Sequence, residues 1–277
     1  MHPTTSGTWW RLALVAPLLA CGAGRDEPAA AVPSAASQPA ATGDQPSPGA
    51  SGSAPSPKSS PGSAPRDGTQ SPGPDDVPPT HFEGREIATT MSYRGADWLT
   101  RSNRDAEEDT VGLHRALELV PGQTACDVGA GNGYHTTRMA QAVGPTGRVL
   151  AVDLQPQMLE KLRTRVEAQG LDNVETILAQ PGDPKLPEGR CDLILLVDVY
   201  HELAWPEPML AAFRRALSAD GRLALVEFRA EDPSVPIKKL HKMSKAQIER
   251  ELSPRGLSLV GSVDTLPWQH LVFYAAN

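Results

Sequence analysis

The sequence predicts an α/β domain in which a doubly wound, mostly parallel sheet of seven strands ends in an antiparallel hairpin. Short apolar segments alternate with amphipathic helical segments from about residue 109 to the end of the chain, and this alternation is typical of a parallel sheet with helices on both faces. The last two apolar segments are separated only by 264–269. That spacing is too short for a helical crossover, so these two strands are expected to pair antiparallel.

The individual elements follow from the spacing of the apolar residues. Seven short apolar segments are expected to be strands: 124–128, 148–154, 174–179, 191–198, 221–228, 257–263 and 270–275. Five segments have apolar residues at helical spacing, and most of them end at a glycine: 109–119, 134–143, 157–169, 206–217 and 244–255. The run 191–198 is the most continuously apolar, which predicts a central strand covered on both faces.

The composition changes before residue 81. Of the 27 prolines in the chain, 13 lie between residues 22 and 80, together with Ala, Ser and Gly and almost no large apolar side chain. Such a segment buries too little surface to offset the entropy lost on ordering. We therefore expect a disordered linker at 21–80, an N-terminal lid or cap segment at 81–108, and the main domain at 109–277.

A short apolar run at the N-terminus, Leu12 to Cys21, follows the positive charge of Arg11. It is too short to span a bilayer, which takes about 20 residues, and it fits a cleaved export signal at 1–20. The residues 18–21 resemble the bacterial lipobox, in which the cysteine is acylated and becomes the new N-terminus. This interpretation makes the protein a lipoprotein of the cell envelope, tethered to the lipid bilayer through Cys21. An ordinary signal peptide, or an unprocessed cytoplasmic protein, is the alternative.

The globular part contains two cysteines, Cys126 and Cys191, whose spacing does not suggest a metal site. Both stand at the edges of apolar runs, so two buried free thiols are the favoured interpretation. A disulfide is the alternative, if the two strands are neighbours in an exported protein. Residues 81–277 carry 22 Lys and Arg against 27 Asp and Glu, a net charge of −5, without a dense basic run. Nucleic-acid binding is therefore not expected.

A glycine run follows the first predicted strand, with Gly129, Gly131 and Gly133 at every second position. Without side chains, the backbone between a strand and a helix can turn sharply and approach a ligand closely. Dinucleotide-binding loops favour G-x-G-x-x-G/A, and the position that would complete this pattern is Tyr134. Its side chain is too large for close helix packing, which counts against a dinucleotide.

Two aspartates accompany the glycine run. Asp153 ends the second predicted strand, where a carboxylate can accept both hydroxyls of a ribose. Its alternative role is to cap the helix that follows. Asp127 stands two positions before Gly129 and is expected to hold the ammonium group of a ligand. Its alternative role is to cap the glycine turn.

The segment from Asp127 to Gly133, together with Asp153 and the tetrad 198–201, resembles the class I S-adenosylmethionine-dependent methyltransferases. The resemblance covers essentially all of 109–277. It implies a Rossmann-like sheet, S-adenosylmethionine as the cofactor, and an adenine held by residues that follow the third and fourth strands. More narrowly, 98–108, 199–202 and 241–243 are similar to a bacterial group of predicted methyltransferases with no assigned substrate.

One position departs from the family pattern. Many relatives have Gly-Asp directly after the third strand to meet the adenine amino group, whereas this chain has Ala179-Gln180, with Asp183 three residues later. The Gln180 side chain can still accept a hydrogen bond. Either Gln180 or Asp183 is the expected adenine contact, and the sequence leaves the choice open.

Methyl transfer from a sulfonium requires a nucleophile that is held in line with the methyl group and relieved of its proton. Candidates after the strand at 191–198 are Asp198, Tyr200 and His201. The ordinary pKa of histidine suits a base near neutrality, although His201 could instead bond a loop carbonyl. Tyr200 could stack on adenine, line the acceptor pocket or pack in the core. Glu227 and His241 are further pocket candidates.

An aromatic and basic cluster precedes the main domain. Its members and the acidic residues close behind it are Tyr93, Trp98, Arg101, Arg104, Glu107 and Glu108. One interpretation is a lid over the acceptor, with an arginine that faces an anionic substrate. The other is a surface helix in which Arg104 and Glu108 pair at i, i+4.

The sequence thus predicts an enzyme that transfers a methyl group from S-adenosylmethionine to a small-molecule acceptor, without a resident metal. A membrane-tethered module that binds the cofactor or a partner without catalysis is the main alternative, because S-adenosylmethionine is made in the cytoplasm. A nicotinamide-dependent oxidoreductase is less favoured, since Tyr134 and the terminal hairpin depart from its pattern. The methyl acceptor and the oligomeric state are not predicted.

Overall fold

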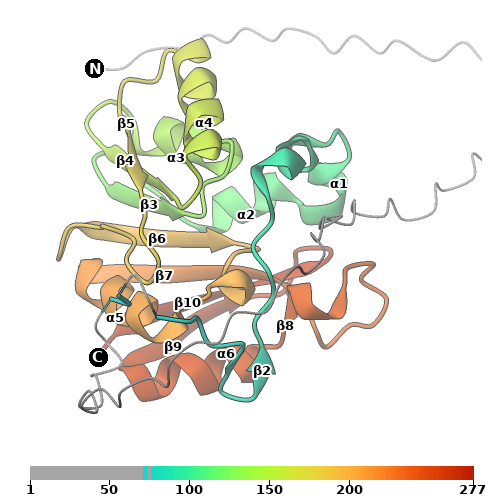
Figure 1. Ribbon diagram of the computed structural model, residues 1–277. Helices are drawn as coiled ribbons and strands as arrows, with labels where there is room; N and C mark the ends of the chain where they lie inside the picture. The colour runs from blue at the N-terminus through green and yellow to red at the C-terminus, as the bar shows by residue number, and fades with distance from the viewer. Residues whose placement is uncertain (1–70, 74–75) are drawn as a thin grey trace, which may run out of the picture. The chain divides into compact units, whose positions relative to one another are not determined.

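One sheet contains most of the strands in the part of the chain that the structure, a computed structural model, describes: residues 71–73 and 76–277. Its main path has the order β5-β4-β3-β6-β7-β10-β9, and β8 pairs with β7 (Figure 1). These strands are β3 (Thr124–Val128), β4 (Arg148–Asp153), β5 (Val174–Leu178), β6 (Cys191–Val197), β7 (Leu217–Arg229), β8 (Lys242–Met243), β9 (Leu257–Val263) and β10 (Gln269–Ala276). A separate hairpin is formed by β1 (His81–Phe82) and β2 (Arg85–Glu86).

The predicted topology is confirmed. The five strands from β5 to β7 pair parallel to one another, and β10 runs antiparallel to both β7 and β9. The apolar strand β6 lies in the middle of the path, as its composition predicted. In contrast, the signal peptide predicted at 1–20, the lipidated Cys21 and most of the linker predicted at 21–80 lie outside the described residues.

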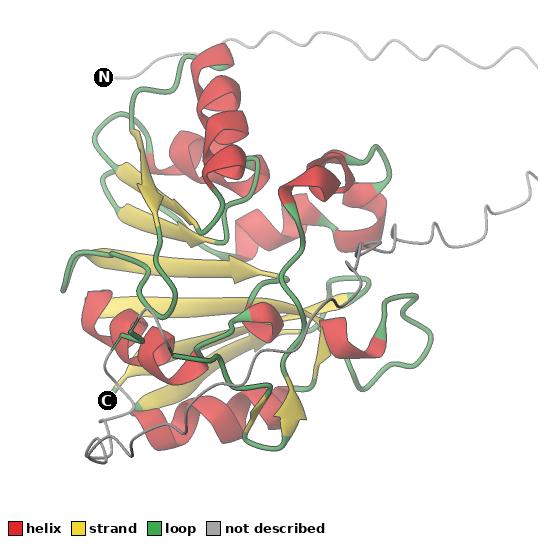
Figure 2. Ribbon diagram, in the orientation of Figure 1, coloured by secondary structure: helices red, strands yellow, loops and turns green. Residues whose placement is uncertain are grey.

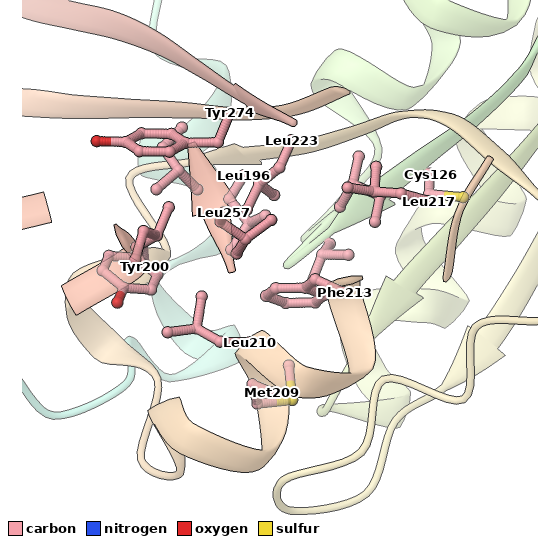
Figure 3. Packing of buried hydrophobic residues seen from close by; sticks show 14 of the residues in the cluster. Cys126, Leu196, Tyr200, Met209, Leu210, Phe213, Leu217, Leu223, Leu257 and Tyr274 are labelled. Atoms are coloured by element: carbon pink, nitrogen blue, oxygen red, sulfur yellow. The ribbon is translucent and has the colours of Figure 1, made fainter. Parts of the chain in front are cut away.

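Helices cover both faces of the sheet (Figure 2). The helices are α1 (Arg104–Glu108), α2 (Thr110–Ala116), α3 (Tyr134–Val143), α4 (Pro156–Ala168), α5 (Pro206–Ala216) and α6 (Lys245–Leu252). Side chains of α5 and α6, among them Phe213 and Ile248, pack on one face, while α2, α3 and α4 pack on the other. Figure 3 shows the core on the α5 face, where Phe213 and Leu210 lie against the strands.

Two helix boundaries differ from prediction for local reasons. The helix expected at 109–119 is preceded by the one-turn α1, and Asp109 between the two has a left-handed backbone with φ 47°. Its side chain caps α2 by accepting the Gly112 N–H at 3.0 Å. The helix expected at 244–255 ends at Leu252 and continues as the 3₁₀ turn η4 (Ser253–Arg255), which contains a proline.

The expectation of two free thiols is wrong. Cys126 on β3 and Cys191 at the start of β6 form a disulfide, with their Cα atoms 5.9 Å apart. β3 and β6 are neighbours because the chain crosses from β5 to the far side of β3 before it forms β6. This crossing places two cysteines that are separated by 65 positions in the sequence side by side in the core.

Candidate active site

The carboxyl ends of β3, β4 and β6 and the loops that follow them form the candidate site, as expected for an open parallel sheet. The N-terminal segment from β2 to α1 runs across these strand ends (Figure 1). Backbone and side-chain hydrogen bonds hold it there. The Ala88 N–H donates to the His201 carbonyl at 3.1 Å, the Tyr93 N–H donates to Gln155 Oε1 at 2.8 Å, and Asn132 Nδ2 donates to the Ala96 carbonyl at 3.0 Å.

The glycine loop after β3 requires glycine for two reasons. Gly129, Gly131 and Gly133 all have positive φ values, of 73°, 54° and 83°, which side chains rarely tolerate. In addition, a Cβ at Gly129 would lie 2.5 Å from a Val199 methyl, and one at Gly131 would lie 2.8 Å from a Leu99 methyl. The loop with Gly129, Gly131 and Gly133, here called the glycine cradle, therefore exposes backbone without side chains. Such a surface fits the close approach of a nucleoside ligand.

Asp153 is placed beside this cradle at the end of β4. Its side chain is buried, and each oxygen accepts one backbone N–H: Oδ2 from Gly131 at 2.9 Å and Oδ1 from Gln155 at 2.8 Å. Burial raises the pKa of Asp153 against the effect of these bonds. A carboxylate oxygen can accept more than one hydrogen bond, so the contact with Gln155 before α4 leaves room for a ribose hydroxyl on each oxygen.

Asp127 on β3 is buried at the base of the same loop. Its Oδ2 accepts a hydrogen bond from the Thr136 hydroxyl at 2.5 Å. Burial raises the pKa of Asp127 to about 6, and the nearby carboxylate of Asp153 contributes in the same direction. Two buried acidic groups thus lie near enough to raise the pKa of Asp127, and a cationic ligand group beside them would be favoured.

Asn132, within the glycine loop, has a buried oxygen with no hydrogen-bond partner among the described residues. Its amide nitrogen is held by the Ala96 carbonyl, so the oxygen cannot exchange places with it without losing that bond. A buried acceptor without a donor is costly, and it is an additional observation that fits a ligand with N–H or O–H groups. Asn132 was not predicted as a site residue, although its place between two glycines is a usable signal.

The two candidates for the adenine contact lie in one tight turn after β5. Gln180 and Asp183 exchange backbone hydrogen bonds of 2.9 Å in both directions. The Asp183 carboxylate is engaged by Lys185, with an Nζ to Oδ2 distance of 2.7 Å, whereas the Gln180 side chain is exposed. Leu154, directly after Asp153, is 47% exposed. An exposed apolar side chain beside a ribose-binding carboxylate suits the face of a base.

On the acceptor side, His201 follows β6 in the 3₁₀ turn η2 (Tyr200–Glu202) and is buried. Its Nδ1 lies 2.6 Å from Glu227 Oε2, and its Nε2 lies 3.1 Å from Nδ1 of His241. Burial alone would lower the pKa of His201, but the carboxylates of Glu227, Glu202 and Asp198 outweigh it and raise the pKa. The ring of His201 therefore bonds side chains and not a loop carbonyl. Glu227 and His241, the two further pocket candidates, both contact it directly.

The other two acceptor-side candidates are held by their neighbours. Tyr200 is fully buried, and its hydroxyl donates to Glu251 at 2.6 Å; Figure 3 shows its ring among the core side chains. This position favours the packing role that the sequence left open. The side-chain nitrogen of Gln269 on β10 donates to both carboxylate oxygens of Asp198, at 2.9 and 2.8 Å. Burial raises the pKa of Asp198, and Glu108 and Glu227 add to this effect.

Two arginines of the N-terminal segment, Arg101 and Arg104, are engaged by carboxylates of the same segment. Arg104 Nε lies 2.8 Å from Glu108, which is the i, i+4 pair, and Arg101 Nη2 lies 2.5 Å from the same carboxylate. Arg104 also lies 3.0 Å from His135 Nε2 on α3. These buried contacts dock α1 on the main domain, which favours a structural role for the two arginines over contact with an anionic substrate.

Comparison with known proteins places the domain in a family. A family model described as a methyltransferase domain matches residues 119–269, which include the glycine loop, Asp153 and His201. The chain belongs to this methyltransferase family. Its cofactor is S-adenosylmethionine. The glycine cradle, Asp153 and the unpaired side-chain oxygen of Asn132 fit that molecule. The nicotinamide-dependent alternative is thereby excluded.

The chain matches only part of the length of the following two relatives. It is 31% identical over 165 residues to the ubiquinone/menaquinone biosynthesis C-methyltransferase UbiE of Ectopseudomonas mendocina, a match that covers 54% of this chain and 64% of the relative. It is 37% identical over 112 residues to an uncharacterized 37.1 kDa protein in transposon TN4556 of Streptomyces fradiae, covering 40% of this chain and 32% of that protein.

The fold of the methyltransferase is also found among solved structures. A SAM-dependent methyltransferase from Aquifex aeolicus superposes with a TM-score of 0.63 at 23% identity. The match covers 67% of this chain and 98% of that structure. At this level of identity the comparison establishes the Rossmann-like fold with its antiparallel last strands.

Proposed function

We propose that this chain transfers a methyl group from S-adenosylmethionine to a small-molecule acceptor, which binds beside His201 under the N-terminal segment. The main support for this proposal is the order in which β4, β3 and β6 lie side by side in the sheet. The exits of β4 and β3 present Asp153 and the glycine cradle, and the exit of β6, next to β3, presents His201 backed by Glu227. A donor site and an acceptor site therefore adjoin at one edge of the sheet.

The cofactor residues have separate tasks in this proposal. Asp153 accepts the ribose hydroxyls, Asp127 attracts the ammonium group, and the exposed Gln180 meets the adenine in preference to Asp183, whose carboxylate is paired with Lys185. When bound, S-adenosylmethionine supplies an electrophilic methyl group on a sulfonium. The protein then has to place the acceptor in line with that methyl group, exclude water and receive a proton.

His201 is the group best placed to receive this proton. Glu227 lies on Nδ1 of His201 and favours its protonated form, so a proton taken up at Nε2 is stabilised by a buried carboxylate. We expect His201→Ala to reduce turnover by about 100-fold, the size of a typical general acid–base contribution, while the dissociation constant of S-adenosylhomocysteine changes less than twofold. Radiolabelled methyl transfer and calorimetry measure the two effects. Unaltered turnover would return His201 to a purely structural role.

Cofactor affinity should depend on pH through Asp127. Burial raises the pKa of this group from its ordinary 3.8 to about 6 in the free protein, and a bound ammonium group favours the ionised form and lowers the pKa again. The affinity for S-adenosylhomocysteine is therefore complete above pH 6 and weakens as the pH falls below it, by up to about tenfold per pH unit. Calorimetry between pH 5 and 8 measures this slope.

Asp127→Asn is the matched variant for this pH dependence, because an amide oxygen can still accept the Thr136 hydroxyl. The variant should bind the cofactor more weakly at pH 8 and should lose the part of the slope that Asp127 causes. A slope of equal size in the variant and the parent would assign the titration to another group, with Asp153 the first candidate.

The activity itself is tested by a substrate screen. Purified full-length protein is incubated with S-adenosylmethionine labelled in the methyl group and with periplasmic, membrane and cytoplasmic small-molecule extracts. Incorporation of label that disappears with His201→Ala supports the proposal. Tight binding of S-adenosylhomocysteine without labelling of any extract would favour the alternative of a tethered cofactor-binding module.

We also propose that the protein is exported and anchored through an acylated Cys21. The lipobox and the disulfide support this location, since a disulfide in the core is unusual in a reducing cytoplasm. Among the described residues, no helix combines the length and apolar character needed to cross a membrane. Mass spectrometry of the membrane fraction should find a mature chain that begins at acylated Cys21, and an intact N-terminus in the soluble fraction would contradict it.

A further inference from the structure

Three side chains with metal-binding atoms converge at the exit of β6. They are His201 and Glu202 from η2 and His241 from the 3₁₀ turn η3 (Lys239–His241), directly before β8. Nε2 of His201 and Nδ1 of His241 are 3.1 Å apart. Oε1 of Glu202 lies 3.5 Å from the same nitrogen of His241 and 3.8 Å from that of His201. Among the described residues, this is the one group of its kind.

These separations match a metal coordination sphere. Nitrogen and oxygen ligands bind zinc at about 2.1 Å, and two ligands at the tetrahedral angle are therefore roughly 3.4 Å apart. The three separations between the donor atoms, of 3.1, 3.5 and 3.8 Å, bracket that value. A metal ion can thus be placed among the three donors without a large rearrangement of the backbone.

The orientation of His201 is fixed by an outer carboxylate. Glu227 is fully buried, accepts the Tyr200 N–H at 2.9 Å with one oxygen, and lies 2.6 Å from Nδ1 of His201 with the other. A carboxylate on one ring nitrogen keeps the proton there, so the other nitrogen presents a lone pair. In metalloproteins, histidine ligands are usually supported by a carboxylate or carbonyl in this way.

Glu202 is oriented in a comparable manner. Its Oε2 accepts the Met91 backbone N–H at 3.1 Å, which turns Oε1 toward the two histidines. Its side chain is 12% exposed and that of His241 is 23% exposed, so an ion could reach the cluster from solvent. The carboxylates of Glu202 and Glu227 bring two negative charges to the two imidazoles, which a divalent cation would neutralise.

We propose that His201, Glu202 and His241 form a binding site for a divalent transition metal ion, with zinc as the reference ligand. Two imidazole nitrogens and one carboxylate oxygen select transition metals over Mg²⁺, which prefers oxygen donors. Three protein ligands leave at least one coordination position open, as in catalytic zinc sites. The sequence did not indicate this site, because two of its ligands are adjacent and the third follows 39 positions later.

The site has a consequence that rests on the proposed methyl transfer. It lies on the acceptor side, so in the metal-bound enzyme the ion would take the place of the proton at Nε2 of His201 and would itself lower the pKa of an acceptor hydroxyl, and His201 would act as the base only without the metal. The acceptor class that this arrangement suits is an alcohol, phenol or enol with a metal-coordinating oxygen. Removal of the metal should then lower turnover without a change in the affinity for S-adenosylhomocysteine.

Metal binding is tested on the full-length protein with Zn²⁺ alone. Equilibrium dialysis with elemental analysis should find one saturable zinc ion per chain that excess Mg²⁺ does not displace. Glu202→Gln and His241→Ala change partly exposed ligands and should each weaken zinc binding by more than about 100-fold, the upper end of the loss seen for outer-shell changes. His81→Ala, which removes an exposed histidine that is not one of the three ligands, is the matched control and should bind zinc like the parent.

A cobalt-substituted sample gives a second readout, because its visible absorption reports nitrogen and oxygen ligands in a four- or five-coordinate site. The proposal is overturned if no saturable zinc binding occurs, or if Glu202→Gln and His241→Ala both bind zinc as tightly as the control. S-adenosylhomocysteine binding is measured in parallel. Its retention in a protein without zinc binding would refute the metal site alone, whereas its absence would refute the proposed methyl transfer.

Discussion

Reduction of the Cys126–Cys191 disulfide is expected to lower the free energy of unfolding by roughly 4 kcal/mol. The disulfide closes a loop of 65 positions, and a loop of that length restricts the unfolded chain by about this amount in the chain-entropy description. Urea unfolding with and without a reducing agent measures the difference. The double variant Cys126→Ala and Cys191→Ala should be destabilised by a similar or larger amount, because it also removes buried side chains.

Two controls separate this effect from other thiol chemistry. Cys21→Ser leaves the loop intact and should unfold like the parent in oxidising buffer. Thiol alkylation after unfolding should label two more cysteines in the reduced protein than in the oxidised one. Equal stability in both buffers, with both core thiols shown to be reduced, would contradict the prediction.

The disulfide links β3 and β6, the two strands whose carboxyl ends lead into the glycine loop and into η2. Loss of the link should therefore reduce cofactor affinity more than a surface change of equal cost in stability. For an exported enzyme, this arrangement makes the folded site dependent on an oxidising compartment.

Asp153→Ala is expected to weaken the binding of S-adenosylhomocysteine by at least tenfold. The variant removes a charged acceptor from two ribose hydroxyls, and hydrogen bonds to a charged group contribute about 1.5–3 kcal/mol. It also removes the acceptor for the Gly131 N–H, which helps to hold the glycine loop. Isothermal calorimetry at pH 8 measures the dissociation constant, with circular dichroism as the check on folding.

Asp153→Asn and Asp172→Ala refine the test. The asparagine keeps one oxygen, which can accept either the Gly131 or the Gln155 N–H but not both, so the difference in loss between Asp153→Asn and Asp153→Ala measures the share of that one backbone bond. Asp172 lines a hollow beside the amino ends of β4 and β5, together with Arg148 and Glu175. Its replacement should leave cofactor binding unchanged. An unaltered dissociation constant in Asp153→Ala would remove this residue from the cofactor site.

The acceptor side shows where inference from the sequence reached its limit. His201 was predicted from its place after a central strand, and the packing of Tyr200 remained one of several alternatives. Glu202 and Gln269 were not predicted as site residues, since their types and neighbours carry no local signal of a site, whereas Asn132 had such a signal in its place between two glycines. Their relevance comes from partners that are distant in the chain, such as Met91 for Glu202 and Asp198 for Gln269.

The fold class, the sheet with its terminal hairpin, the glycine loop and the place of Asp153 could be predicted from the sequence, because periodicity, turn residues and a contiguous motif are local properties of the chain. The three-dimensional fold was needed to show that Cys126 and Cys191 are bonded, that Arg101 and Arg104 are paired with carboxylates, and that His201, Glu202 and His241 meet. These contacts depend on which strands become neighbours and on how the N-terminal segment crosses their ends. Both are set by packing between residues far apart in the sequence, which no local pattern encodes.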